Sequence, residues 1–331
     1  MHINIPIFLP ELACRQKCIF CNQSSISGTP NIPQPQDVDS IVTRHLATVN
    51  EGVVVEIAFF GGSFTGIENE LQIRYLQEAY KFVKSGQVSG IRISTRPDYI
   101  TEPILQLLKT FGVTAIELGA QSFDEEVLLK SNRGHLAGQI EVAAKLIKSY
   151  DFELGLQMMV GLPFDTLEKA IFTARKIVAS GANTTRIYPA LVIAKTAMAT
   201  LYKSNIYSPL SLDEAVDWCA EIIPIFKDGG VNILRVGLHP SEEFDNGEVL
   251  LAGPYHPSFR ELVESRMWQK RMVAMLPSQK GKLIIKVAPK QINWAIGFGA
   301  SNKIWLKEKY GWIKIIASNE LKNNEFTFSY C

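Results

Sequence analysis

The sequence predicts an α/β fold with a partial barrel of six strand–helix units, a less regular α/β extension and a small α+β unit at the carboxyl end. First, residues 1 to about 200 alternate short β-rich runs with stretches whose apolar residues recur at helical spacing. Second, these runs are apolar on both faces, which is typical of parallel strands joined by right-handed helical crossovers. Third, a chain of 331 residues exceeds one small module and can bury about three-quarters of its unfolded surface.

Six runs are predicted to be the strands of the barrel. They cover residues 3–8, 53–60, 90–95, 114–119, 153–160 and 184–192. Helical spacing between the second and third strands places Leu71, Tyr75, Leu76, Ala79 and Phe82 on one apolar stripe. Residues 23–36 are rich in Pro, Ser and Gly and predict a loop. In barrels of this kind the chemistry lies at the carboxyl ends of the strands, so a motif that follows a strand is a candidate for function.

Two further units are predicted after the barrel. The extension contains an amphipathic helix at residues 212–226, with Cys219 inside it. The last part of the chain has, in order, a strand at 283–287, a helix from Pro289, a glycine-containing turn, a helix at 301–310 and a strand at 312–317. We therefore expect domains at residues 1–205, 206–275 and 276–331.

Charge is distributed unevenly along the chain. The formal net charge is only +1, so the whole molecule is not a polycation. Residues 276–331 hold nine lysines and three acidic residues, a balance of +6, whereas the remainder carries 25 basic and 30 acidic residues, a balance of −5. Only the carboxyl-terminal unit is therefore suited to binding a polyanion.

Composition excludes other classes of protein. No apolar run approaches the roughly 18 residues of a membrane span. The first residues lack a basic region, and Pro6 and Pro10 interrupt their short apolar stretch, so we expect no signal peptide and a cytoplasmic location. Five cysteines, three of them within eight residues, do not indicate a disulfide scaffold.

The three grouped cysteines follow the first strand in the sequence CRQKCIFCN. Cys14, Cys18 and Cys21 could each bind one iron of a 4Fe–4S cluster, which would leave the fourth iron open to an amine and a carboxylate of a ligand. Two alternatives remain at this point. The cysteines could form a structural zinc site, which usually needs a fourth ligand such as His45, or they could be unconnected buried thiols.

Polar and glycine residues follow the next two strands. The sequence FFGGSFTG brings Gly61, Gly62 and Ser63, whose backbone could approach a ligand closely or form a plain turn. The sequence ISTRPDY brings Ser94 and Arg96, which could bind a hydroxyl and a carboxylate. Arg96 could equally cap a helix or pair with a neighbouring acid.

The fourth and fifth strands end in a similar way. The sequence ELGAQSFD contains Glu117 and Gln121, of which Glu117 could serve as an internal salt-bridge partner. The sequence QMMVGLPFDT contains Gly161 and Leu162 in a tight bend, while its two methionines favour the core.

Together, these motifs closely resemble the radical S-adenosylmethionine (SAM) superfamily, and within it the group of the Elongator catalytic subunit. The resemblance covers about residues 5–205 and includes ELGAQSFDEEVLLKSNRGH and RIYPALVIAKTAM, with Arg133, His135, Tyr188, Pro189 and Thr196. A more distant resemblance is to the oxygen-independent coproporphyrinogen oxidases. Residues 206–331 are too few and wrongly patterned for Elongator's acetyltransferase domain, so its acetyl-CoA-dependent reaction is not expected to carry over.

The resemblance implies the cofactors and their ligands. Cys14, Cys18 and Cys21 would hold a 4Fe–4S cluster whose open iron is chelated by SAM. Reductive cleavage of SAM would give a 5′-deoxyadenosyl radical that abstracts a hydrogen atom, with the electron supplied by a reductant such as flavodoxin or ferredoxin. The implied contacts to SAM are Phe20 near the adenine, Gly61, Gly62 and Ser63 for the ammonium group, Ser94 and Arg96 for ribose or carboxylate, Gln121 for the ribose, and Gly161 with Leu162 for the adenine.

The carboxyl-terminal unit resembles a KH RNA-binding module. KH modules clamp a nucleic-acid backbone with a Gly-x-x-Gly turn, and here Gly297 is followed by alanine at the second glycine position, Ala300. Lys290, Lys303 and Lys307 would flank bound phosphates, unless they form only a basic solvated face. We therefore expect a radical SAM enzyme acting on RNA, most simply transfer RNA. The alternatives are a small-molecule radical enzyme and a catalytically inactive iron–sulfur RNA-binding protein.

Overall fold

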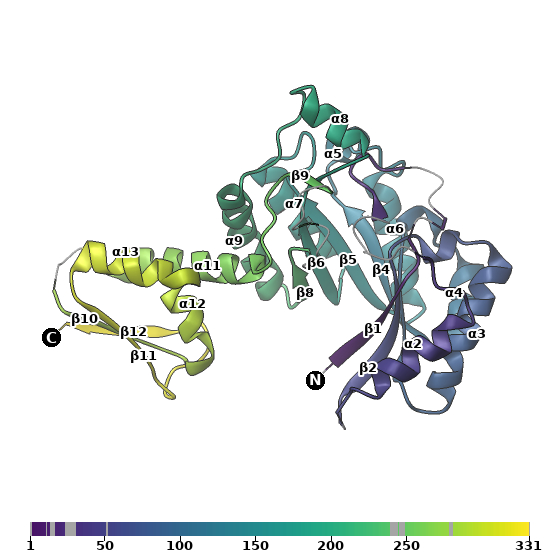
Figure 1. The fold of residues 1–331 in the computed structure, drawn as a ribbon, viewed down its shortest axis with the longest axis horizontal. Coiled ribbons are helices and arrows are strands. Elements are labelled where there is room, and N and C mark those ends of the chain that lie inside the picture. The colour runs from purple at the N-terminus through teal and green to yellow at the C-terminus, as the bar shows by residue number, and fades with distance from the viewer. Residues whose placement is uncertain are drawn as a thin grey trace.

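The computed structural model describes residues 2–10, 12–13, 17–23, 31–50, 52–238, 244, 249–277 and 281–330. A large curled sheet with helices packed against it forms most of the molecule, and a smaller sheet lies beyond the long helix α11 (Figure 1). No described helix has both the length and the apolar character needed to span a membrane.

The large sheet has seven parallel strands in the order β1-β2-β3-β4-β5-β6-β8. Its edge strands, β1 and β8, do not pair with each other in the described residues, so the barrel is partial, as predicted. The strands are β1 (His2–Phe8), β2 (Val54–Phe60), β3 (Gly90–Thr95), β4 (Val113–Gln121), β5 (Glu153–Val160), β6 (Thr184–Pro189) and β8 (Asn232–Val236).

Two details of the large sheet differ from the prediction. The run at 184–192 divides into β6 and the short β7 (Val192–Ile193), which pairs with β9 (Leu250–Ala252) in a separate antiparallel sheet. A seventh strand, β8, lies in the extension, where its short and partly polar sequence NILRV gave no strand signal.

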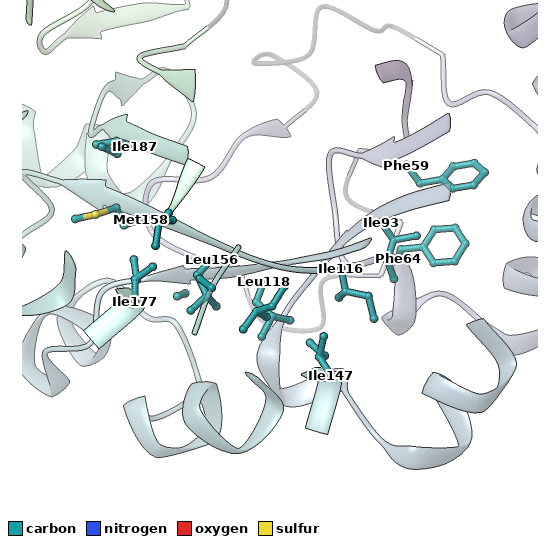
Figure 2. Close-up of a cluster of buried hydrophobic side chains, with 14 of the residues drawn as sticks. Phe59, Phe64, Ile93, Ile116, Leu118, Ile147, Leu156, Met158, Ile177 and Ile187 are labelled. Carbon is teal, nitrogen blue, oxygen red and sulfur yellow. The ribbon is translucent and has the colours of Figure 1, made fainter. Parts of the chain in front are cut away.

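The helices pack on the outer face of this sheet and form its hydrophobic core. Ile116 and Leu118 of β4 and Leu156 of β5 point toward Ile147 and Ile177, which come from two of these helices (Figure 2). These helices are α2 (Asp37–Leu46), α3 (Asn69–Lys84), α4 (Glu102–Thr110), α5 (Glu125–Lys130), α6 (Ala137–Ser149), α7 (Leu167–Ala179), α9 (Leu212–Asp228) and α11 (Phe259–Met275), with the 3₁₀ turns η1 (Phe64–Gly66) and η2 (Pro97–Tyr99). A further helix, α8 (Ala197–Lys203), packs in a separate small cluster against Ile19 and Phe20.

The inner face of the sheet is polar, because side chains of a strand alternate between its two faces. Residues that alternate with the core positions on β3, β4, β5 and β6 carry charges or amides. They are Arg92, Glu117, Gln157 and Arg186.

The carboxyl-terminal unit has its own sheet and its own core. Its elements are β10 (Leu283–Val287), η3 (Pro289–Gln291), α12 (Ile292–Ile296), η4 (Phe298–Ala300), α13 (Ser301–Tyr310), β11 (Ile313–Ala317) and β12 (Phe326–Tyr330). The central strand β10 runs parallel to β11 and antiparallel to β12. Trp268 and Met272 of α11 belong to this second core, so α11 connects the two parts of the molecule.

Candidate active site

The loops that follow the parallel strands meet at one edge of the large sheet, because the carboxyl ends of parallel strands lie together. The cysteine segment follows β1, and its described part, residues 17–22, is hydrogen-bonded at that edge to residues distant in sequence. Ile19 N–H donates to Ser131 O at 3.2 Å, and Asn132 Nδ2 donates to Lys17 O at 2.9 Å. Met198 N–H donates to Ile19 O at 2.8 Å. The sequences KSNRGH and AKTAM therefore support the cysteine segment, a role that their residue types did not indicate.

Arg133 connects the cysteine segment to β4. Its Nη1 donates to Cys18 Sγ at 3.0 Å, and its Nη2 donates to Gly119 O. Cys18 is buried and Cys21 is half-buried, while Cys14 lies outside the described residues. This contact fixes the Cys18 sulfur beside the end of β4.

The alternative zinc ligand lies elsewhere. His45 is exposed on α2, and its Nδ1 donates to Ile41 O of the same helix at 2.9 Å. Within the described ranges, which omit Cys14, no three His, Cys, Asp or Glu side chains gather as a metal site.

Of the buried polar atoms that have no partner in the described part of the chain, two belong to predicted SAM contacts. Arg96 donates from Nε and Nη2 to the two carboxylate oxygens of Asp98, each at 2.9 Å, which leaves its Nη1 buried without an acceptor. Gln121 ends β4 with φ +67°, and its Oε1 is buried without a donor. A buried polar group without a partner costs roughly 1–3 kcal/mol, so these atoms fit a polar ligand such as SAM.

The glycine segment after β2 lies beside the cysteine segment. Gly61 has φ +95°, and a Cβ there would lie 3.3 Å from Leu9 N and Gln23 Oε1. Gly62, Ser63 and Ser94 border one small gap between side chains at the ends of β2 and β3, which is too narrow to admit a water molecule. Of the candidate SAM contacts, those after β2 and β3 therefore come together.

The bend after β5 is held by hydrogen bonds to its backbone. Gly161 N–H donates to Asp165 Oδ2 at 2.9 Å, and Tyr207 Oη donates to Gly161 O at 2.6 Å. Leu162 is buried in a small cluster against which Phe20 packs, so two of the three predicted adenine neighbours contribute to one apolar surface. Burial raises the pKa of the Asp165 carboxyl to about 7.

His135 lies buried close to the same edge. Both of its ring nitrogens are without a partner in the described residues, and burial lowers its pKa to about 4, helped by the Arg133 and Arg96 charges. The ring is therefore neutral near pH 7.

The inner face carries a network of ion pairs. Glu117 accepts from Arg186 Nε at 2.7 Å and Nη2 at 3.0 Å and from Gln157 Nε2 at 2.8 Å. Arg92 Nη2 pairs with Glu56 and Glu153, each at 3.0 Å. Glu117 is thus the internal salt-bridge partner that the sequence left as one of two alternatives.

The three candidate RNA-binding lysines lie apart from this edge. Lys290, Lys303 and Lys307 are exposed on the carboxyl-terminal unit. The turn that resembles a KH clamp packs on α11, because Phe298 N–H donates to Ser265 Oγ at 2.9 Å. Gly297 and Ala300 both have positive φ, at +86° and +63°.

Comparison with known proteins places this arrangement. A family model described as the radical SAM superfamily matches residues 12–177, and one described as the Radical SAM C-terminal domain matches residues 182–269. Elongator complex protein 3 of Homo sapiens is 32% identical over 233 residues, which cover 64% of this chain and 42% of that protein. The tRNA uridine(34) acetyltransferase of Methanocaldococcus infernus is 28% identical over 186 residues, covering 49% of this chain and 34% of that protein. The matches thus span only about a third to two-fifths of these relatives.

A solved structure shares the fold. The archaeal Methanocaldococcus infernus Elp3 with a deleted amino terminus aligns with a TM-score of 0.65 at 22% identity, over 81% of this chain and 63% of that one. The radical SAM family model spans half of the sequence, and its residues form the sheet and the loops described above. The chain therefore belongs to the radical SAM superfamily, whose enzymes use a 4Fe–4S cluster and S-adenosylmethionine as cofactors.

Proposed function

We propose that this radical SAM enzyme removes a hydrogen atom from a nucleotide of RNA, with transfer RNA as the substrate. The curated relatives support an RNA substrate, since one of them is named for uridine 34 of tRNA. The charge of +6 on residues 276–331 supports it independently. When bound, the cluster and SAM supply an electron and a 5′-deoxyadenosyl radical, and the protein supplies binding and geometry. The proposal covers the radical step and not acetyl transfer.

The assignment of the SAM contacts rests on two buried atoms, one on Arg96 and one on Gln121, that have no partner in the described residues. Arg96 Nη1 would donate to the SAM carboxylate, and Gln121 Oε1 would accept from a ribose hydroxyl. Asp98 holds the Arg96 guanidinium in place by two hydrogen bonds, so the free nitrogen is preorganised. The apolar surface of Phe20 and Leu162 would exclude water from the adenine.

The cysteine segment would hold the cluster through Cys14, Cys18 and Cys21. Arg133 would hold the Cys18 sulfur toward β4 by its hydrogen bond. His135 is neutral, so it adds no positive charge beside the two arginines.

Binding of SAM tests the cofactor half. In the anaerobically reconstituted protein, we expect Arg96→Met to weaken SAM binding by roughly 10- to 100-fold, because a hydrogen bond between charged groups contributes about 1.5–3 kcal/mol. Arg74→Met, at an exposed position on α3, is the matched control. Equal affinity in the Arg96 variant and the control, measured by calorimetry, would contradict the assignment.

Binding of tRNA tests the substrate half. Replacing Lys290, Lys303 and Lys307 by glutamine (the tail-lysine variant) should weaken tRNA binding about tenfold or more. It should also lower the salt dependence of that binding, because each phosphate contact releases counterions. Cleavage of SAM without substrate should stay unchanged. A triple variant of exposed lysines on the outer helices is the control: Lys81, Lys84 and Lys145. Equal tRNA binding by the tail variant and the wild type would favour a small-molecule substrate.

The product is found by comparing modified nucleosides. Mass spectrometry of tRNA from a deletion strain should show one modification missing, and the wild-type gene should restore it. An unchanged nucleoside profile would contradict an RNA substrate.

A further inference from the structure

Two arginines lie side by side on the inner face of the sheet at its β8 edge, and a third, exposed on α11, is near enough to act on one of them. Arg186 of β6 and Arg235 of β8 are direct partners in the strand register, so their side chains leave the same face side by side. Arg260, in the first turn of α11, is close enough for its charge to act on Arg235. Tyr188, two residues after Arg186 on β6, lies between the charges of Arg186 and Arg235.

Among the described residues, only one of these arginines pairs with an acid. Glu117 is already committed to Arg186 by two hydrogen bonds. No carboxylate pairs with Arg235 or Arg260 anywhere in the described ranges. Among the described residues, Arg235 and Arg260 therefore have no carboxylate as an ion-pair partner.

Such a cluster is unfavourable without a ligand. Burial, together with the Arg186 and Arg260 charges, holds the pKa of Arg235 below its usual range. Arg235 nevertheless remains charged near pH 7, because an arginine deprotonates only in strong base. In the described part of the chain, Arg235 thus lies beside other cations without an ion pair of its own, whereas Arg186 is held by Glu117.

We propose that Arg235, Arg260 and Tyr188 form a binding site for a phosphate group of the substrate, and that Arg186, beside Arg235 in the sheet, borders this site. Guanidinium groups donate in a planar fork that matches phosphate oxygens. Forks that arrive from a strand and from a helix can bind different oxygens of one phosphate, whereas a carboxylate offers only two oxygens. Burial raises the pKa of the Tyr188 hydroxyl, so it remains a donor near pH 7.

This inference rests on the proposed use of the sheet's inner face for substrate, and it names the chemical group that is bound there. Arg186 also stacks on the ring of Phe60, with its guanidinium carbon 5.0 Å from the ring centroid, so its position is fixed from both sides. The phosphate could belong to the RNA backbone or to a small phosphorylated molecule. The experiment separates these sources.

The probe is inorganic phosphate, titrated calorimetrically against the full-length protein at constant ionic strength. We expect Arg235→Gln to lower phosphate affinity about tenfold or more, which corresponds to at least ~1.4 kcal/mol. Arg235→Lys keeps the charge but loses the planar pair of N–H donors, so its phosphate affinity should lie between those of the wild type and Arg235→Gln. Arg175→Gln, at an exposed arginine on α7, should bind as the wild type does. Unchanged phosphate affinity in Arg235→Gln would overturn the proposal.

Thermal unfolding in phosphate-free buffer separates binding from a structural role. Because Arg235 repels its neighbours, Arg235→Gln should melt at the same or a higher temperature than the wild type. A clear fall in the melting temperature would show that Arg235 supports the fold, and would also overturn the proposal.

Salt dependence of tRNA binding identifies the source of the phosphate. If the RNA backbone occupies the site, Arg235→Gln should lower the slope of log K against log salt by roughly 0.7–0.9. A loss of phosphate affinity with an unchanged slope would assign the site to a small phosphorylated molecule. Failure of the RNA proposal would instead appear as unchanged tRNA binding in the tail-lysine variant, so the two failures are distinguishable.

Discussion

Glu117 is the side chain whose neutralisation should most disturb the inner face of the sheet. It is 1% exposed and accepts three hydrogen bonds, two of them from Arg186 and one from Gln157. Although burial opposes ionisation, the Arg186 and Arg92 charges hold its pKa below the usual range. In Glu117→Gln one oxygen remains an acceptor, whereas the other becomes an amide nitrogen that faces the N–H groups of Arg186.

The magnitude follows from leaving a buried charge without its counter-charge. Breaking a buried ion pair by removing one partner costs about 3–5 kcal/mol. We expect the lower end, near ~3 kcal/mol, because the glutamine still accepts one hydrogen bond. At roughly 2–4 °C per kcal/mol for a large domain, the melting temperature should fall by about 6–12 °C.

The effect should depend on pH in one direction. Because the folded-state pKa of Glu117 is lowered, its contribution is present above the ordinary value of 4.5 and disappears as the pH falls through the folded-state pKa. The difference between variant and wild type should therefore be full at pH 7 and shrink below about pH 4.5.

Calorimetric melting at pH 7 and in acid is the assay. The control is Glu78→Gln, which removes an exposed pair with Lys81 on α3 and should cost less than about 1 kcal/mol. Glu117→Gln also frees Arg186, so phosphate affinity should rise while stability falls. A melting temperature equal to that of the control at pH 7 would refute the reasoning.

Three further variants test the loops at the mouth of the sheet. Between pH 5 and 7 the wild type should lose about 2 kcal/mol of stability, because a carboxyl whose folded-state pKa is raised to about 7 stays protonated in the folded protein but ionises in the unfolded chain. Asp165→Asn should remove this loss. Parallel pH profiles of the two proteins would contradict this. Cys18→Ser should prevent iron loading in anaerobic reconstitution, whereas Cys219→Ser should not, since burial raises the pKa of that thiol to about 12; equal iron content would exclude Cys18 as a ligand. Gly61→Ala should lower the melting temperature more than Gly52→Ala, because both have positive φ but only Gly61 has neighbours within 4 Å of a Cβ, and equal shifts would show that crowding is unimportant there.

The sequence predicted the parallel sheet because its core strands are apolar on both faces, and such runs stand out locally. The short β8, with Asn232 and Arg235, lacked that pattern and became recognisable only by its pairing with β6. The segment 184–192 gave one run, but β6 ends at Pro189 and the chain then enters a second sheet. Continuous apolar character did not reveal this change of direction.

The candidate site, like the fold, could be predicted from the sequence only in part. Residue types at strand ends indicated Arg96 and Gln121, each of which has a buried polar atom without a partner in the described residues, and their contact with SAM stays a prediction. By contrast, the bond from Arg133 to Cys18 joins residues 115 positions apart, and no local pattern specifies such a contact. The arginine cluster was missed for the same reason, since its members lie on β6, β8 and α11.

The support of the cysteine segment has a consequence for synthesis of the protein on the ribosome. Asn22 and Ala194 lie 172 positions apart and are hydrogen-bonded, and Met198 holds Ile19. At a translation rate of about 5–20 residues per second, residues 194–198 are synthesised roughly 10–35 s after the cysteines. During that interval the nascent chain presents its cysteines on an unsupported segment. A cluster bound by these cysteines would therefore be assembled late, after translation of most of the barrel.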